Sequence, residues 1–383
     1  MKLNDIAEFV TDKISSSSIS LDRYVTTDSL LQNRRGREIA QNLPPVPCAL
    51  THYKQGDVLV ANIRPYLKKV WYADSEGGCS SDVLVFRAKN GHCPPFLYTV
   101  LMQDAFFDYA MSGAKGSKMP RGDKDQIMRY ELPTFTPMEE ENIGNMMVDI
   151  MSKININRQI NDNLEAMAKQ LYDYWFVQFD FPNEEGKPYK SSGGAMVWNE
   201  KLKREIPHGW DFCFLENLLT IRNGRDHKHL ADGIYPVYGS GGEMRKVSEY
   251  LYDGESVLMP RKGSLNNIMY VNEAFWTVDT MFYSEMKLSN CAKYIYYTIK
   301  DIDFTRWDSG TGVPSMTSST LYSIKLVKPK NETLKKFDEM ISPLFEHMKQ
   351  ISEQNVVLTK QRDELLPLLM NGQATVNYHL SAC

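Results

Sequence analysis

The 383-residue sequence lacks the features of a membrane protein, an exported protein or a disulfide scaffold. Its apolar runs, of which residues 96–102 are among the longest, fall short of the roughly 18 residues of a membrane span. The opening residues, MKLND, contain no apolar signal core. None of the six cysteines forms a C-x-x-C pair, which argues against a zinc ribbon. We therefore expect a globular, cytoplasmic protein of two or three domains.

Credible catalytic motifs are also lacking. The string Cys93–Phe96 imitates an amino-methyltransferase loop, but its cysteine is a poor hydrogen-bond acceptor. Asp279 with residues 285–287 imitates a nuclease site, but the matching stretch earlier in the chain lacks the second acid. His227 and His229 have no third metal ligand nearby in the sequence. We predict that the chain is not an enzyme and itself holds no metal or cofactor.

The sequence does contain an internal repeat, at a separation of nearly 200 residues. Residues 79–86 match residues 276–283 at an offset of 197, and residues 58–59 match residues 257–258 at an offset of 199. Loop insertions would account for the small drift. Short β-type runs between turns predict a mixed α/β fold for both globular regions.

A long amphipathic segment follows each globular region. Its apolar seam advances in 4-3 steps, at residues 143, 147, 150, 154, 157, 161, 164, 168, 171 and 175, and again at positions 194 further along. This 3.5-residue period predicts two coiled-coil helices. Four polar residues on the seam are expected to fix its register: Asn157, Asn161, Asn355 and Arg362.

The order along the chain is therefore globule, helix, globule, helix. The predicted segments are a first domain at 1–137, a helix at 138–180, a linker at 181–206, a second domain at 207–330, a helix at 331–372 and a loose tail at 373–383. Pro343 predicts a kink or a late start in the second helix.

Charge is unevenly distributed over these segments. The net charge is −4, but residues 138–178 carry 7 acidic and 3 basic side chains and residues 331–371 carry 7 and 5. The helices therefore account for −6, which leaves +2 on the rest of the chain. Basic residues cluster in both globular regions, interleaved with aromatic and small polar residues, a pattern that suits phosphate and guanine contacts. A solvated surface is the alternative interpretation for each single cluster.

Five strings resemble the specificity subunit of type I restriction–modification systems. They are LYDYWFVQFDFP (171–182), GKPYKSSGG (186–194), IPHGW (206–210), YPVYGSGG (235–242) and SGTGVP (309–314). The resemblance covers nearly the whole chain. The first globular region departs from the family, because no Pro-x-Gly-Trp opening precedes residues 3–6 and the SGTG string is altered at 112–116.

The resemblance implies an α/β fold in which two target recognition domains are separated by two long antiparallel coiled-coil helices with pseudo-twofold symmetry. Each domain would read one half of a bipartite, asymmetric site on double-stranded DNA. The helices would dock two modification subunits, which carry S-adenosylmethionine and methylate adenine. Restriction subunits that use ATP and Mg²⁺ would join them, and no membrane is involved.

Charge and position beside glycine turns select eight candidate DNA contacts: Arg64, Lys68, Lys118, Arg121, Arg225, Arg245, Arg261 and Lys262. A helix of about 39 residues spans roughly 58 Å, which limits the unread spacer to roughly 17 base steps. Two other interpretations stay open, a DNA-free two-domain coiled-coil adaptor and a free-standing DNA methyltransferase or nuclease. The sequence does not reveal which bases are read.

Overall fold

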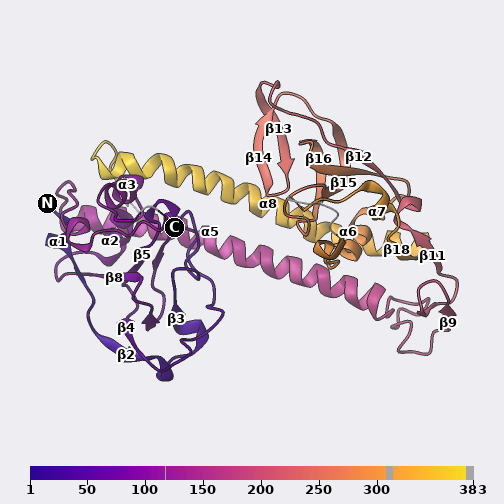
Figure 1. The fold of residues 1–383 in the computed structure, drawn as a ribbon, viewed down its shortest axis with the longest axis horizontal. Helices are drawn as coiled ribbons and strands as arrows, with labels where there is room; N and C mark the ends of the chain where they lie inside the picture. The colour runs from indigo at the N-terminus through magenta and orange to yellow at the C-terminus, as the bar shows by residue number, and fades with distance from the viewer. Residues whose placement is uncertain (117, 308–313, 377–383) are drawn as a thin grey trace, which may run out of the picture. The chain divides into compact units, whose positions relative to one another are not determined.

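The computed structural model describes residues 1–116, 118–307 and 314–376. They form two compact units, of which unit 1 comprises residues 1–161 with the chain from Gln350 onward, and unit 2 comprises Asp162–Lys349. Two long helices, α5 (Pro137–Tyr172) and α8 (Asn331–Met370), contribute to both units (Figure 1). The predicted fold class, mixed α/β with two long helices, is confirmed. The SGTG string at 309–312 lies outside the described residues.

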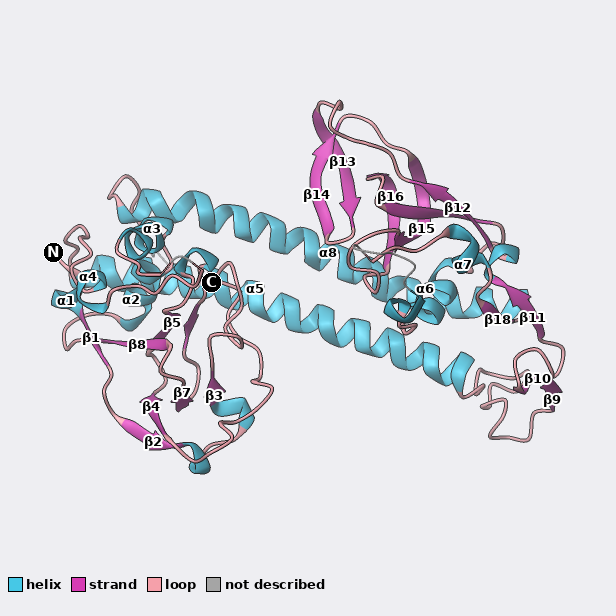
Figure 2. Cartoon of the chain, viewed as in Figure 1, coloured by secondary structure: helices cyan, strands magenta, loops and turns pink. Residues whose placement is uncertain are grey.

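Unit 1 contains two four-stranded sheets and four short helices (Figure 2). The first sheet is antiparallel, in the order β1 (Ala7–Phe9), β8 (Val83–Ala88), β5 (Val58–Ala61), β6 (Val70–Tyr72). The second has the order β2 (Lys13–Ser15), β4 (Ala49–Tyr53), β7 (Gly77–Cys79), β3 (Tyr24–Val25), and its β7–β3 pair is parallel. The helices are α1 (Leu3–Ile6), α2 (Pro94–Leu101), α3 (Asp104–Ser112) and α4 (Lys124–Ile127).

The core of unit 1 is one cluster of buried side chains from the first sheet, from α2 and α3, and from both long helices. It includes Phe96, Val100, Phe106 and Phe107 with Ile143, Met147, Leu366 and Leu369. Gly144 allows the close approach of α2 to α5, because a Cβ there would lie 2.4 Å from the backbone nitrogen of Phe96. Ala374 and Val376 also pack against this core, so the predicted loose tail is held in place at its beginning by apolar contact.

The starts of the long helices follow from local sequence. Thr136 and Glu139 form a capping box, in which the Thr136 N–H donates to Glu139 Oε2 at 2.7 Å and the Glu139 N–H donates to Thr136 Oγ1 at 3.3 Å. Pro137 occupies the first helical position, where no N–H is needed. Helix α8 begins at Asn331, well before Pro343, so of the two predicted alternatives, a kink or a late start, the late start is wrong. Buried Phe337 and Ile341 anchor that first stretch in the core of unit 2.

Unit 2 is built on a six-stranded sheet in the order β12 (Leu219–Asn223), β17 (Met281–Met286), β15 (Tyr252–Pro260), β16 (Met269–Thr277), β13 (Asp232–Gly239), β14 (Gly242–Val247). Its β16–β13 pair is parallel. Two further antiparallel strand pairs form separate sheets, β9 (Met196–Asn199) with β10 (Arg204–Pro207) and β11 (Asp211–Phe214) with β18 (Lys325–Lys328). The helices are α6 (Ala292–Lys300) and α7 (Ser318–Tyr322).

The core of unit 2 is aromatic. Trp175 and Phe176 lie on a π-helical turn, Asp173–Val177, that continues α5, and Phe176 contacts Phe337 with ring centroids 4.9 Å apart. Phe181 stacks on Tyr189 and on Trp210, at 4.7 Å in each case. The family-specific strings at 171–182 and 206–210 thus supply packing. The predicted linker is ordered, because it contributes stacked rings and the β9–β10 pair.

A buried lysine ties the sheet of unit 2 to helix α8. The Lys293 side chain, on α6, is 4% exposed and its Nζ lies 2.6 Å from Glu255 on β15 and 2.8 Å from Asp338 on α8. Tyr270 donates a further hydrogen bond to Glu255 at 2.5 Å. The pairing of both carboxylates with one cation fixes how α6 and α8 sit on the sheet.

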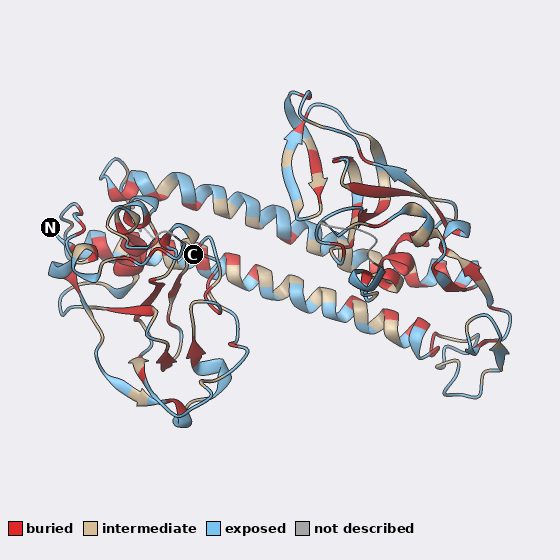
Figure 3. Cartoon of the chain, in the orientation of Figure 1, coloured by how far each residue is buried: buried red, intermediate tan, exposed pale blue. Residues whose placement is uncertain are grey.

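The sequence repeat occupies equivalent places in the two units. The repeated pairs Val58–Leu59 and Val257–Leu258 lie on β5 and β15, and the repeated runs that begin at Val83 and Thr280 lead into or form β8 and β17. Strand β5 pairs with β8 and β15 pairs with β17, antiparallel in both cases. Helices α2 and α6, which follow, are buried along most of their length (Figure 3).

Within unit 1, α5 and α8 run antiparallel along a seam with polar contacts. Asn157, 1% exposed, donates to Gln354 Oε1 at 2.7 Å and to Asn355 Oδ1 at 2.9 Å. Asn161 donates to Ser352 at 3.0 Å. Arg362, 4% exposed, pairs with Asp363 at 2.7 Å and reaches the sulfur of Met151 at 3.6 Å. The role of these four residues in register stays a prediction.

Gly144→Ala should destabilise unit 1 although alanine favours helix by about 1 kcal/mol. The added Cβ would collide with the backbone at Phe96, so we expect a net loss of about 1–3 kcal/mol in the free energy of unfolding. Chemical denaturation followed by tryptophan fluorescence measures it. Gly241→Ala is the control, because a Cβ there meets open space. A stabilised Gly144→Ala variant would contradict the packing argument.

Asn157→Ala should lower the free energy of unfolding by about 1–3 kcal/mol, because it removes a buried donor that serves two acceptors. Asn163→Ala, at an exposed position on the same helix, should change it by less than about 0.5 kcal/mol. Thermal unfolding of both variants makes the comparison. Equal losses at the two positions would show that the seam hydrogen bonds add nothing to stability.

Candidate nucleic-acid interface

Unit 1 brings two basic loops together. Arg64 follows β5, and its backbone N–H donates to the carbonyl of Pro120 at 2.8 Å. Ile63 and Arg121 form a bridge between the same two loops. Both arginine side chains are exposed, and that of Arg121 pairs with Asp82 at 2.6 Å. The structure therefore places Arg64 and Arg121 on adjoining loops, as a shared contact surface requires.

The other two candidates in unit 1 differ from each other. Lys118 is exposed in the loop before Arg121. Lys68 is largely covered, with a side chain 28% exposed and its Nζ 2.6 Å from Asp104 on α3. Asp104 also receives a hydrogen bond from Arg34. Lys68 is therefore engaged inside the protein, which the sequence did not indicate.

Three of the four candidates in unit 2 gather at the turn between β16 and β17. The Arg225 backbone N–H donates to the Thr277 carbonyl at 2.8 Å. The backbone N–H groups of Arg261 and Lys262 donate to the Thr280 carbonyl at 2.8 and 3.2 Å. The three side chains are exposed. Trp276 donates its indole N–H to the Arg225 carbonyl at 2.9 Å and so helps to hold the Arg225 backbone.

Arg245 is held differently. It lies on β14, its side chain is 33% exposed, and its guanidinium donates to the Leu230 carbonyl at 2.6 Å. Asp232 lies 3.5 Å away. These contacts tie the β14 side chain to the segment before β13, so Arg245 is less available to an external partner than Arg261.

In both units a backbone hydrogen bond to a proline carbonyl holds the loop that carries the basic residues. In unit 1 the Arg64 N–H binds the Pro120 carbonyl, and in unit 2 the Gly263 N–H binds the Pro314 carbonyl at 3.1 Å. Arg64 and Gly263 are separated by 199 residues, the offset of the strands that precede them. In both units the loop after the central repeated strand is thus held by a backbone hydrogen bond from a distant loop.

Sequence reasoning missed the carboxylates that position these cations. Asp82 pairs with Arg121, and Asp104 pairs with Arg34 and Lys68. Burial alone would raise the pKa of the Asp104 carboxyl, but the hydrogen bonds from Lys68 and Arg34 lower it overall. The repeat could have pointed to Asp82, which matches Asp279, whereas no pattern in the sequence marks Asp104.

Over the part of the chain that the structure describes, no group of three or more histidine, cysteine, aspartate or glutamate side chains is arranged to hold a metal ion. Glu285, part of the nuclease-like string, pairs with Arg222 at 3.1 Å. Among the same residues, no helix combines the length and apolarity of a membrane span.

Comparison with known proteins connects this geometry to a family. Residues 207–358 match the family model described as the type I restriction modification DNA specificity domain. The chain is similar to type I restriction–modification specificity subunits. The resemblance predicted from the sequence is thereby confirmed. Arg225, Arg245, Arg261 and Lys262 lie within the matched specificity domain, whereas the unit 1 candidates lie outside it.

Relatives extend the similarity over most of the chain. The MjaIX specificity subunit of Methanocaldococcus jannaschii is 24% identical over 358 residues, covering 86% of this chain and 80% of that protein. The HindI specificity subunit of Haemophilus influenzae is 20% identical over 451 residues, covering 97% and 98%. The crystal structure of the type I restriction–modification S subunit from M. genitalium shares the fold, with a TM-score of 0.63 at 16% identity, covering 97% of this chain and 95% of that one.

Proposed function

We propose that this chain is the non-catalytic DNA-recognition subunit of a type I restriction–modification complex. The observation that carries the proposal is the match of residues 207–358 to the DNA specificity domain, with exposed Arg225, Arg261 and Lys262 gathered at one turn of it. Arginine and lysine side chains held on backbone-anchored turns suit contacts to phosphates and guanine edges.

The proposed division of labour follows the predicted segments. Residues 1–137 and 207–330 would be the two recognition domains, each reading half of a bipartite asymmetric site. Residues 138–180 and 331–372 would dock two adenine-methylating modification subunits, which restriction subunits join. S-adenosylmethionine, ATP and Mg²⁺ would belong to these partners and none of them to this chain, and the complex would act in the cytoplasm.

Deletion of this chain alone should abolish adenine methylation at one bipartite motif in a host that carries it with its neighbouring genes. Methylome sequencing of the two strains measures this and gives both half-sites. Restoring the chain from a plasmid should restore the motif, which serves as the control. If methylation is unchanged although the modification subunits are expressed, the proposed function is wrong.

Single substitutions in the assembled complex should separate contacts from supports. Lys262→Ala should weaken binding evenly across sequences and reduce the slope of log affinity against log salt by about 0.9, as for a lost phosphate contact. Arg245→Ala should leave that slope unchanged, because its guanidinium already serves the Leu230 carbonyl. Anisotropy titrations at several salt concentrations measure both slopes. Lys187→Ala, at an exposed position of the linker, is the control and should also leave the slope unchanged. An unchanged slope for Lys262→Ala would remove Lys262 from the contact surface.

A further inference from the structure

Two turns in unit 1 contain several non-glycine residues with left-handed backbone. Seven non-glycine residues in the described chain have positive φ, and four of them, Asn33, Arg34, Arg64 and Lys68, lie in these two turns. Left-handed backbone is unfavourable for residues with a Cβ and persists where the surroundings hold it in place. Such strain concentrates at functional sites, so the contacts that hold these two turns point to a candidate site.

The turns are joined to each other through the backbone. The Asn33 N–H donates to the Leu67 carbonyl and the Arg34 N–H donates to the Lys68 carbonyl, both at 2.9 Å. Pro65–Leu67 form a 3-10 turn flanked by Arg64 and Lys68. Any movement of Arg34 or Lys68 is therefore transmitted to Arg64 through a short, hydrogen-bonded segment.

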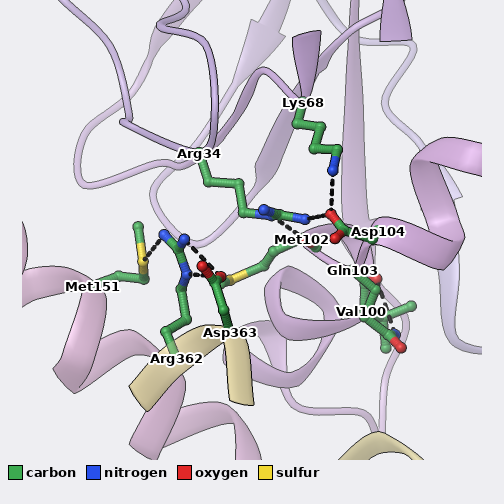
Figure 4. Close-up of polar contacts among 9 residues, drawn as sticks. All are labelled: Arg34, Lys68, Val100, Met102, Gln103, Asp104, Met151, Arg362 and Asp363. Atoms are coloured by element: carbon green, nitrogen blue, oxygen red, sulfur yellow. Dashed lines mark hydrogen bonds and ion pairs between the residues drawn. The ribbon is translucent and has the colours of Figure 1, made fainter. Parts of the chain in front are cut away.

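One carboxylate binds a side chain from each of the two turns. Arg34 and Lys68 converge on Asp104, at the start of α3 (Figure 4). The Arg34 side chain is 8% exposed and also donates to the carbonyl of Met102. Asp104 neutralises the buried Arg34 cation and the Lys68 ammonium together, so loss of its charge would release both turns.

The repeat shows why Arg64 itself is informative. Its mate Gly263 also has a left-handed backbone, with φ of 91°, and makes the equivalent hydrogen bond to a proline carbonyl. Unit 2 thus meets the same backbone demand with glycine, which has no Cβ to strain. Unit 1 keeps an exposed arginine there, with φ of 53°, despite the strain that a Cβ brings in this region.

We propose that Asp104 is a positioning residue for DNA recognition: by clamping Arg34 and Lys68 it holds the left-handed turn that presents Arg64 to duplex DNA. Lys68 is then a strut and not a phosphate contact. This inference rests on the proposed function, because it names the support of one of the proposed contacts.

The test uses the full complex with modification subunits and a labelled duplex that carries both half-sites, compared with a scrambled duplex. Arg64→Gly should weaken specific binding about ten- to hundredfold while the unfolding midpoint stays the same or rises, since glycine relieves the left-handed strain. Asp104→Asn should weaken binding about three- to tenfold in the parent background, as a partial displacement of one such contact. In the Arg64→Gly background Asp104→Asn should have no further effect.

Two further variants complete the design. Lys68→Met should weaken binding as Asp104→Asn does and leave the salt slope unchanged, whereas a lost phosphate contact would reduce the slope by about 0.9. Glu76→Gln, which removes an exposed carboxylate 4.0 Å from Arg23 in the same unit, should bind as the parent does.

The outcomes separate the two claims. Equal losses from Asp104→Asn with and without Arg64, or parental binding by Asp104→Asn, would overturn the positioning role while leaving the proposed function intact. A reduced salt slope for Lys68→Met would make Lys68 a direct contact and would also overturn it. If the parent complex does not distinguish the half-site duplex from the scrambled one, the proposed function fails first, and the inference with it.

Discussion

The packing of each globular region on the same two helices is the constraint from which the rest of the structure follows. In unit 1, side chains of α2 and α3 share one buried core with Ile143 and Met147 of α5 and Leu366 of α8. Unit 2 buries its aromatic core against Trp175 and Phe337. The basic loops are therefore carried by domains that are not free to pivot on their own stretch of helix, since moving them would expose these side chains.

Polar contacts add orientation to this apolar packing. Lys293 joins Glu255 of the sheet to Asp338 of α8, and Asn157 joins Gln354 and Asn355 across the seam. Apolar surfaces tolerate small sliding, whereas a buried donor with two acceptors has few satisfactory positions. The same logic operates at smaller scale in the turns of unit 1, where Asp104 serves two cations. Burial of apolar side chains thus determines how the elements of each unit pack, and a few carboxylates and amides determine how individual side chains are oriented.

The sequence revealed the parts of this structure that depend on periodicity and failed on those that depend on distant partners. Ten seam positions at a constant offset predicted both long helices, and the repeated strands fell on equivalent sheet positions. The sequence did not predict the ion pair of Lys68 with Asp104 or the hydrogen bond of Arg245 to the Leu230 carbonyl. Each needs a partner that only folding brings close. The stacking of Phe181 on Tyr189 and Trp210 was likewise not predictable, because Trp210 comes close to these rings only in the folded chain. Pro343 predicted a kink or a late start of the second helix, and the late start does not occur because Phe337, before the proline, packs in the core of unit 2.

Unit 1 is discontinuous, and this has a consequence for its synthesis. Its core includes Leu366, Leu369 and Met370, which are translated after the whole of unit 2. Domains generally fold in the order in which they are made. Here residues 1–161 lack part of their core until the chain beyond Lys349 has been made, whereas Asp162–Lys349 is complete before that. Truncation after residue 349 would therefore destabilise unit 1 most, although most of unit 1 is translated before unit 2. Unit 2 would keep its own core intact.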